Sequence, residues 1–532
     1  MKQLAEMLGN SFPQFASALT GIIFIVFLVL QISDDYDKIV KFIKRLFDFR
    51  KYIDTLIYKK KREGFNRVLA DHDFLGWQFE LMKVIYGPLI EKKDEELKKH
   101  GGSIGFSTIK LDDSNGRSYS YESVSIRMPR VPYPFTGVCP KKELRTSPGL
   151  ENAKIADLDK AINGGIITSF KRQIRRYYAM IRATIRYPRR LGYMLGEIVQ
   201  DGSEAGKPGW HLTAYSGVYE HNVRTSHILE YEIYRLYKRV KHRKEWKSEN
   251  LAALGRDRIL KELPIREHLH KQFIRDGDES DILISGKHRA SLMGVQAFVL
   301  IKNKSGSYDA LRIRRSENVA AKPGFLQFIP SGGFEAMNDC TDFDSQWDNY
   351  SLTKAIFREL LEECFGQDED DKHATGNNVS PDRLYSNEQI KKLVEMLENT
   401  EADRPNAEMA LLGTTMNLVG LRQELSFILR VDDPSFSGKL IANYESRTAV
   451  QLVDICHMEE YGFWVRPKEE QTEGQKGKKG RRKKGKNKEQ GENDLENLNC
   501  TSAGLFELAR ESSIYKEALE HGESKDDLVN VF

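Results

Sequence analysis

Cysteine is scarce in this chain of 532 residues, which contains only five cysteines, widely spaced. No CxxC pair is present, and this excludes a thioredoxin-like redox motif and a zinc ribbon. A scaffold held by disulfide bonds is excluded as well. We therefore expect the bulk of the chain to lie in a reducing compartment.

Several motifs of nucleotide and metal enzymes are also missing. The chain has no GxxxxGK[ST] loop, no GxSxG elbow, and no HExxH pair among its 12 histidines. A P-loop nucleotide triphosphatase, a serine hydrolase of the elbow type and a zinc protease of the HExxH type therefore have no support in the sequence. No histidine is placed by the sequence to activate Cys364, and we expect this cysteine to be a packed thiol.

The composition nevertheless predicts folded domains. Hydrophobic residues make up 40% of the chain and charged residues 30%, which excludes disorder of the whole chain. At roughly 100–200 residues per domain, the length corresponds to about two to four domains. We see no internal repeat.

Positive charge is concentrated in one tract. The formal net charge of +4 includes nine basic residues between Lys476 and Lys488, and without these nine it is −5. This argues against a protein that binds nucleic acid over its whole surface. The surrounding segment 468–493 has no apolar residue, so we expect a disordered insertion. It could bind anionic lipid, attract nucleic acid, or act only as a solubilising loop.

The N-terminal segment 12–32 has no charged residue. At about 1.5 Å per residue it reaches about 30 Å, the hydrocarbon thickness of a bilayer. We predict a transmembrane helix, with a cleaved signal peptide and a buried soluble helix as alternatives. Basic residues cluster after this segment and only Lys2 precedes it. The positive-inside rule then predicts a single-pass protein of the inner or plasma membrane, with its N-terminus outside and its bulk in the cytoplasm.

The chain between the membrane segment and residue 265 has no chemical motif. A juxtamembrane stretch has amphipathic helical spacing, and it could lie on the membrane surface or form a packed connector. We expect helix from Lys59 to Gly102, strands over Ser107–Val138, and a second helical region over about Leu158–Tyr193. The basic stretch 171–190 of this last region fits a helix face that is solvated or paired with the protein's own acidic surface. It also fits a surface that binds nucleic acid or phosphate.

Chemistry is concentrated between residues 290 and 430. We predict strands over Met293–Ile301, Ala310–Arg315 and Gly324–Glu335, then a helix over Leu352–Gly366. On this helix Glu359, Glu362 and Glu363 share one face, and Arg358 is placed to pair with Glu362. Like charges so close repel, so either a solvated acidic face or a bound divalent cation such as Mg²⁺ would explain the pattern.

The order of these motifs, IPSGGFE followed by a helix with RELLEE, resembles the Nudix superfamily. The resemblance covers about residues 285–515, including the later strand pair in Leu411–Val431 and a closing helix. It implies an α/β/α sandwich that cleaves a diphosphate bond in a nucleoside diphosphate derivative with Mg²⁺ or Mn²⁺. It also implies the following roles: Gly332, Gly333 and Glu335 in the phosphate and metal loop, Arg358 as the orienting arginine, Glu359, Glu362 and Glu363 as metal ligands, and Glu359 also as a base. Glu424, in the later strand pair, is a further candidate base on expected geometry alone.

The sequence departs from the family pattern in two places. Asn338 stands where the family has its first glutamate, and about a dozen extra residues precede the helix; Asp339, Asp342 or Asp344 could supply the missing carboxylate. The glycine after the glutamate pair is shifted to Gly366. The sequence therefore leaves three interpretations open: an active hydrolase, a membrane effector that binds a nucleotide without cleaving it, and a scaffold without a nucleotide ligand. Nudix-like domains fused to membrane segments near bacterial oligonucleotide cyclases, in antiviral systems, are the family precedent for the second.

We summarise the predicted organisation as a mixed α+β or α/β protein with one membrane helix. Its partners would be a nucleotide derivative and the membrane, with nucleic acid not expected and a homo-oligomer left open. The predicted segments are a tail 1–11, the membrane helix 12–32, a helical connector 33–100, an α+β region 101–265, a Nudix-like domain 266–520 with an acidic insertion 337–351 and the basic insertion 468–493, and a tail 521–532.

Overall fold

The structure of the protein is a computed structural model. The predicted membrane segment 12–32, the basic insertion 468–493 and most of the acidic insertion lie outside the residues that it describes. Within the described ranges no helix is both long and apolar enough to cross a membrane. The described residues are 56–111, 117–135, 165–182, 191–201, 209–315, 324–336, 350–365, 381–399, 406–440, 450–461 and 495–529.

The chain divides into two compact units, Met1–Gly64 and Phe65–Phe532. Of the first unit, only residues 56–64 are described, and they are helical. The second unit includes the predicted boundary at residue 266, and its largest sheet contains strands from both sides of that boundary. We therefore describe Phe65–Phe532 as one body.

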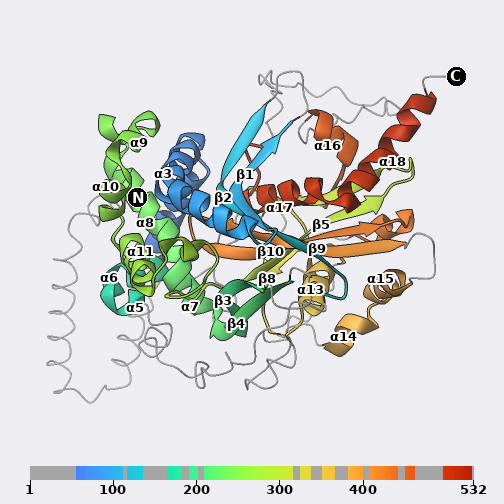
Figure 1. Cartoon of the computed structure of the whole chain (residues 1–532), viewed down its shortest axis with the longest axis horizontal. Coiled ribbons are helices and arrows are strands. Elements are labelled where there is room, and N and C mark those ends of the chain that lie inside the picture. Colours follow the sequence, from blue (N-terminus) through green and yellow to red (C-terminus); the bar gives the residue numbers. More distant parts are fainter. Residues whose placement is uncertain are drawn as a thin grey trace, which may run out of the picture. The chain divides into compact units, whose positions relative to one another are not determined.

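A large mixed sheet forms the centre of the second unit (Figure 1). Its main path has the order β1-β2-β9-β10-β5-β6-β11, with β7 paired to β6 and β8 paired to β5. The pair β10–β5 is parallel and the other pairs of the sheet are antiparallel. The strands are β1 Ser103–Lys110, β2 Ser118–Pro132, β5 Gly294–Lys302, β6 Tyr308–Arg314, β7 Leu326–Phe328, β8 Ser331–Gly333, β9 Ala407–Asn417, β10 Arg422–Val431 and β11 Gln451–Asp454, and β3 Leu191–Asp201 and β4 Gly209–Val218 form a separate hairpin.

Helices cover both faces of this sheet, and Figure 1 shows α17 and α13 on opposite sides of it. The rings of Phe298 on β5 and Phe328 on β7 lie against Phe506 on α17, in the main apolar core. The described helices are α3 His72–Lys98, α5 Ile166–Ser169, α6 Lys171–Ile181, α7 Tyr219–Asn222, the π-helix η2 Val223–His227, α8 Ile228–Val240, η3 Lys244–Trp246, η4 Ser248–Asn250, α9 Leu251–Leu254, α10 Arg256–Lys261, α11 Pro264–Asp276, η5 Glu279–Leu283, α13 Leu352–Cys364, α14 Pro381–Ser386, α15 Glu388–Glu398, η6 Pro434–Lys439, α16 Ile455–Tyr461, α17 Cys500–Glu511 and α18 Ser513–Val529.

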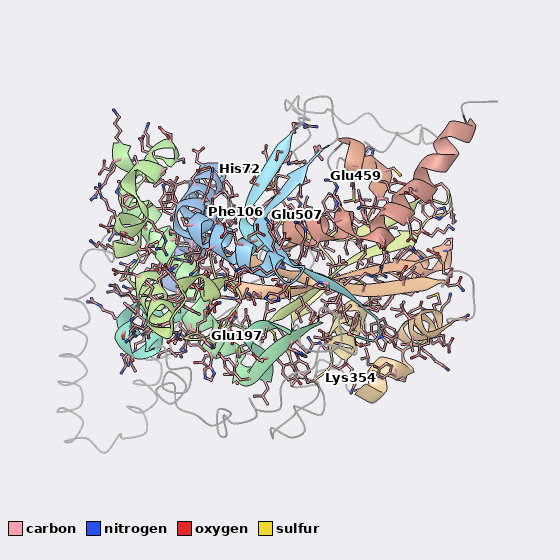
Figure 2. All side chains as sticks on the ribbon, in the orientation of Figure 1. His72, Phe106, Glu197, Lys354, Glu459 and Glu507 are labelled. Carbon is pink, nitrogen blue, oxygen red and sulfur yellow. The ribbon has the colours of Figure 1, made fainter. Side chains whose placement is uncertain are left out.

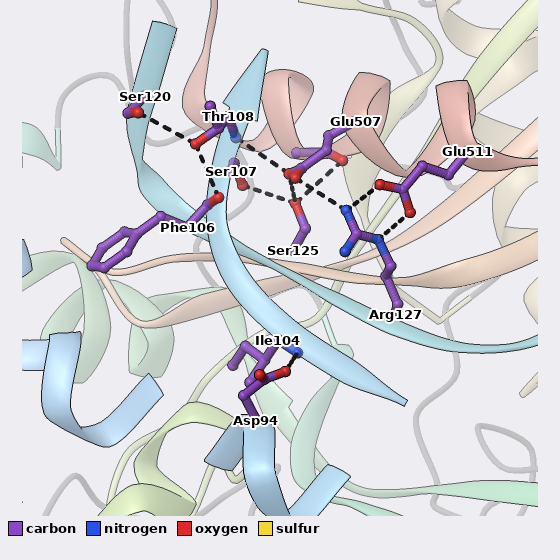
Figure 3. Close-up of polar contacts among 11 residues, drawn as sticks. Asp94, Ile104, Phe106, Ser107, Thr108, Ser120, Ser125, Arg127, Glu507 and Glu511 are labelled. Carbon is purple, nitrogen blue, oxygen red and sulfur yellow. Dashed lines mark hydrogen bonds and ion pairs between the residues drawn. The ribbon is translucent and has the colours of Figure 1, made fainter. Parts of the chain in front are cut away.

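The β1–β2 hairpin is joined to α17 by a polar cluster (Figures 2 and 3). The Glu507 carboxylate accepts hydrogen bonds from Ser125 Oγ at 2.7 Å, from Arg127 Nη2 at 3.1 Å and from the Thr108 backbone N–H at 3.3 Å. Burial raises the pKa of Glu507, although these donors lower it. The region before residue 266 is thus held to the C-terminal helix by specific hydrogen bonds as well as by strand pairing.

The mixed α+β class is confirmed, and most predicted elements are present. The strand expected over Gly324–Glu335 is divided into β7 and β8 by Ile329 and Pro330, because proline cannot donate to a strand ladder. The prediction that the second helical region extends to Tyr193 was wrong at this end, because Tyr193 lies in strand β3. The helix itself is formed by α5 and α6 over 166–181.

Candidate functional site

Helix α13 carries the RELLEE segment. Its N-terminus is capped by Ser351, whose side chain accepts a hydrogen bond from the Lys354 N–H at 3.2 Å. Figure 2 shows Lys354 near this end of the helix. Apolar residues such as Ile356 and Leu360, one turn apart, are buried, and this face fixes the rotation of the helix about its axis.

The Gly-rich segment forms strand β8 at the edge of β5. Gly333 lies opposite Gly294 and Gly332 lies opposite Val295 in an antiparallel register. On the other side of β5, Glu424 of β10 lies opposite the same Gly294. Three neighbouring strands therefore bring Glu424, Gly294 and Gly333 into one row.

Arg358 joins α13 to the Gly-rich segment. It is 1% exposed, and it donates hydrogen bonds to the backbone carbonyls of Gly333 at 2.6 Å and Glu335 at 3.1 Å. It also forms an ion pair with its neighbour Glu359. The predicted pairing with Glu362 is present as a longer contact of 3.7 Å between Nε and Oε1.

Glu359 lies directly against Gly332. A Cβ atom added to Gly332 would be 2.0 Å from Glu359 Oε2, so only glycine leaves room for this carboxylate. The pKa of Glu359 is raised to about 7: burial is the largest cause, the Arg358 guanidinium opposes it, and the Glu362 carboxylate adds to it. A carboxyl group with a pKa near neutrality can exchange a proton at physiological pH.

The other two glutamates of the segment have different surroundings. Glu363 is 4% exposed and its Oε2 accepts a hydrogen bond from the Ser331 N–H at 2.6 Å. The Glu362 side chain is 27% exposed. Among the described residues, no three His, Cys, Asp or Glu side chains are grouped as ligands of a metal ion.

Glu424 approaches the same place from β10. Its Oε1 pairs with Arg422 Nη2 at 2.7 Å, while its Oε2 is buried and has no hydrogen-bond partner among the described residues. A Cβ atom on Gly294 would be 2.7 Å from Glu424 Cγ and 3.2 Å from the Gly332 carbonyl oxygen. The structure thus brings Glu424 close to the Gly-rich segment, although it lies 91 residues after Gly333 in the sequence (424 − 333).

The eight predicted site residues fall into one neighbourhood around β8 and α13. The sequence analysis missed three participants: Ser331, Gly294 and Arg422. A glycine at the start of a buried strand can indicate close backbone approach, and Arg422 is two residues from Glu424 on the same strand face. Nothing in the sequence indicated the backbone role of Ser331.

Two remaining predictions concern the surroundings of α13. Cys364 is fully buried, and burial raises the pKa of its thiol, as expected for a packed cysteine. The three aspartates considered as replacements for the missing carboxylate (Asp339, Asp342 and Asp344) lie outside the described residues.

Comparisons with known proteins give a weak structural likeness. No family model matches the chain, and no curated protein matches it at the threshold applied. Among solved structures, a Nudix hydrolase from Alicyclobacillus acidocaldarius matches with 13% sequence identity and a TM-score of 0.19, over 32% of this chain and 81% of that one. A likeness at this TM-score is too weak to establish a shared fold.

Proposed function

We propose that the protein is a membrane-anchored, Nudix-type hydrolase that cleaves a diphosphate bond in a nucleoside diphosphate derivative. The membrane anchor would be segment 12–32, and the hydrolase site would be the neighbourhood of β8 and α13. The proposal begins from the sequence resemblance and is supported by the contacts around Arg358.

The single observation that carries the proposal is the bond from Arg358 to the Gly333 carbonyl. These residues belong to the two sequence blocks that resemble the family, and they are 25 positions apart. If the two short motifs resembled the family only by coincidence, there would be no reason for Arg358 and Gly333 to be in contact. A functional site built from the Gly-rich loop and helix α13 requires such a contact.

Three residues of the site would each have a different role. Arg358 would hold the Gly-rich segment against α13 and fix its carbonyls. Glu359, whose pKa burial raises to about 7, would accept a proton from the attacking water. Glu424, one of whose buried oxygens has no hydrogen-bond partner among the described residues, would serve as a second acceptor or as a ligand for a cation.

The implied cofactor is Mg²⁺ or Mn²⁺. The donor atoms near β8 are carboxylate and carbonyl oxygens, which these hard cations prefer. Held by Glu359, Glu362 and Glu363, the cation would neutralise charge on the diphosphate and lower the pKa of a bound water. For this, Glu359 and Glu363 would have to exchange part of their present contacts with Arg358 and Ser331.

A second candidate function is a membrane effector that binds a nucleotide and cleaves it weakly or not at all, as in antiviral cyclic-nucleotide signalling. Two specific observations favour it. Asn338 replaces the first glutamate of the family motif, and the described carboxylates are not grouped as three metal ligands. Such a site could retain a nucleotide while lacking the full catalytic set.

One experiment separates these functions. The purified full chain in detergent is incubated with Mg²⁺ or Mn²⁺ and a panel of dinucleotides, nucleotide sugars, nucleoside triphosphates and cyclic oligonucleotides, and both products and binding are measured. The double variant Glu362→Gln/Glu363→Gln removes two ligands. Glu395→Gln, on the exposed side of α15, is the matched control.

Metal-dependent cleavage of a diphosphate bond that is lost in the double variant and retained in Glu395→Gln would establish the hydrolase. Tight binding without cleavage would replace it with the effector. If the protein neither binds nor cleaves any compound of the panel, the hydrolase and the effector are both refuted. The remaining interpretation is a scaffold without a nucleotide ligand.

A further inference from the structure

Helix α6 has a surface that is positively charged throughout. Every exposed side chain between residues 171 and 182 belongs to a lysine or an arginine, and the helix contains no acidic residue. Within the described part of the chain, none of these exposed cations forms an ion pair. A solvated helix face typically alternates charges of both signs, so this face has an excess of positive charge that the described residues leave uncompensated. The five cations are Lys171, Arg172, Arg175, Arg176 and Arg182.

These five residues, which we call the cationic face, lie on one side of the helix. At about 100° per residue they fall within roughly 140° of its circumference. The other side is buried through Ile174, Tyr177, Met180 and Ile181, and α6 packs against α8 and η2 (Figure 1). The packing of α6 therefore leaves the cationic face directed to the outside of the second unit.

The buried side of α6 contacts the beginning of the second unit. The ring of Tyr177 lies edge-on to Phe65, with 6.5 Å between the ring centroids, and 5.2 Å from the ring of Tyr231 on α8. Phe65 is the first residue of the second unit, and its ring also lies 4.9 Å from that of Tyr234. Helix α6 is thus packed against the residue at which the chain enters this unit.

The position of Phe65 in the sequence limits its distance from the proposed membrane anchor. Residues 33–64 connect the uncharged segment 12–32 to Phe65. Even fully extended, a connection of this length reaches at most about 110 Å. A chain anchored through segment 12–32 therefore keeps Phe65, and with it α6, within reach of the bilayer surface.

Positive charge continues from α6 onto the neighbouring helix. Arg235 and Lys238 of α8 are exposed, and they lie on the side of α8 that carries Tyr231 and Tyr234. Glu220 of α7 lies next to the Tyr178 hydroxyl, but it is paired with Arg224. This acid is therefore already occupied by a cation outside the cationic face.

We propose that the cationic face of α6 binds the anionic phospholipid headgroups of the membrane in which the chain is anchored. Clustered lysine and arginine side chains are attracted to the negative surface of such a membrane, so the charges are complementary. This inference rests on the membrane anchor of the proposed function, and it does not depend on hydrolysis. Contact through α6 would hold the second unit against the bilayer in a defined orientation.

The aromatic residues of α6 favour lipid over nucleic acid as the partner. Proteins that bind single-stranded nucleic acid combine a positive surface with aromatic rings on which the bases stack. Tyr177 is only 1% exposed, and the Arg224 guanidinium lies over the ring of Tyr178 at 4.1 Å from its centroid. Both rings are therefore occupied, and the cationic face offers charge without a stacking surface.

The test uses the purified full chain in lipid nanodiscs of two compositions, phosphatidylcholine alone and phosphatidylcholine with about 30% phosphatidylserine. Incorporation into the neutral discs tests the anchor separately. Amide hydrogen exchange over residues 165–182, measured by mass spectrometry, then reports contact of α6 with the lipid. A further sample has single-stranded RNA of about 20 nucleotides added to the neutral discs.

Two triple variants separate contact through α6 from general attraction to the lipid. Arg172→Glu/Arg175→Glu/Arg176→Glu reverses the charge of the cationic face. Lys99→Glu/Lys391→Glu/Lys516→Glu is the matched control, because it makes the same change of net charge at exposed positions outside α6. If the first variant does not fold, the single variants Arg172→Glu and Arg176→Glu replace it.

We expect phosphatidylserine to slow the exchange of residues 165–182 in the wild type by about fivefold or more. The slowing should persist in the control variant and disappear in the α6 variant. It should also disappear in about 1 M sodium chloride, where charges are screened beyond about 3 Å.

Equal exchange of the wild type in the two kinds of disc would overturn the proposal, and so would a slowing that the α6 variant retains. Slowing by the RNA but not by phosphatidylserine would replace the membrane with nucleic acid as the partner. If the chain does not enter the neutral discs, the anchor is refuted, and the inference about α6 falls with it. Failure of the anchor is thus distinguished from failure of the cationic face.

Discussion

The Glu359 carboxylate occupies the space beside Gly332 that a side chain would take: a Cβ atom there would lie 2.0 Å from Oε2 and 2.2 Å from Cδ. Glycine at this position is therefore a packing requirement for the buried Arg358–Glu359 pair.

Gly332→Ala should displace Glu359 and disturb its ion pair with Arg358. Inserting a methyl group into a closely packed site costs about 1–3 kcal/mol, and we expect a loss of that size in the free energy of unfolding, measured by urea titration. Hydrolysis should fall with it, because Glu359 is moved. Gly333→Ala is the control, since its nearest neighbour is the far end of the Glu335 side chain at 3.0 Å, which can move. Equal losses in the two variants would contradict this packing.

The stability of the protein should fall as the pH rises from about 5 to 7, in part because of Glu359. Its ordinary pKa is 4.5 and burial raises it to about 7 in the folded state. Between these values the unfolded state releases the proton and the folded state keeps it, so rising pH favours unfolding. Above about pH 7 both states are ionised and the loss is complete.

Urea titrations at pH 5, 6, 7 and 8 measure this effect. Glu359→Gln should make the profile flatter over that range. Glu362→Gln, on a side chain that is 27% exposed, should change it less. The interpretation fails if Glu359→Gln leaves the slope of stability against pH unchanged.

Glu424→Gln should reduce activity without reducing stability. The Oε2 of Glu424 is buried without a hydrogen-bond partner among the described residues, so removing its charge relieves a desolvation cost. The amide oxygen can still accept from Arg422. We expect hydrolysis to fall by about tenfold or more if the carboxylate acts as an acceptor or ligand, while the midpoint of thermal unfolding stays the same or rises. A stability loss with activity retained would show a structural role instead.

Glu507→Ala should destabilise the protein more than Glu511→Ala. Glu507 accepts hydrogen bonds from Thr108, Ser125 and Arg127 at the junction of α17 with β1 and β2 (Figure 3). Removing the Glu507 carboxylate leaves buried donors unpaired, which should lower the free energy of unfolding by about 1–3 kcal/mol. The Glu511 side chain is 53% exposed and pairs with Arg127, and such exposed pairs contribute about 0–1 kcal/mol. Similar losses in both variants, by urea titration, would show that the junction is not specific.

Much of the local structure could be predicted from the sequence. The mostly apolar run Met293–Ile301 predicted a buried strand, and β5 is buried along nearly its whole length. The spacing of apolar and acidic residues predicted α13, and the i, i+4 rule predicted the contact between Arg358 and Glu362. These features depend on backbone periodicity, which a single segment contains. Helix α17, in contrast, was expected only from the family resemblance, as a closing helix.

The tertiary structure decided which distant segments meet. No local pattern indicated that β2 pairs with β9, that β10 runs parallel to β5, or that Glu424 and Gly333 lie on either side of Gly294. The raised pKa of Glu359 is likewise a consequence of burial. Solvent exclusion and strand pairing arise from the whole fold, so the sequence alone determined the residue types and their local spacing, while the tertiary contacts set their charge states and partners.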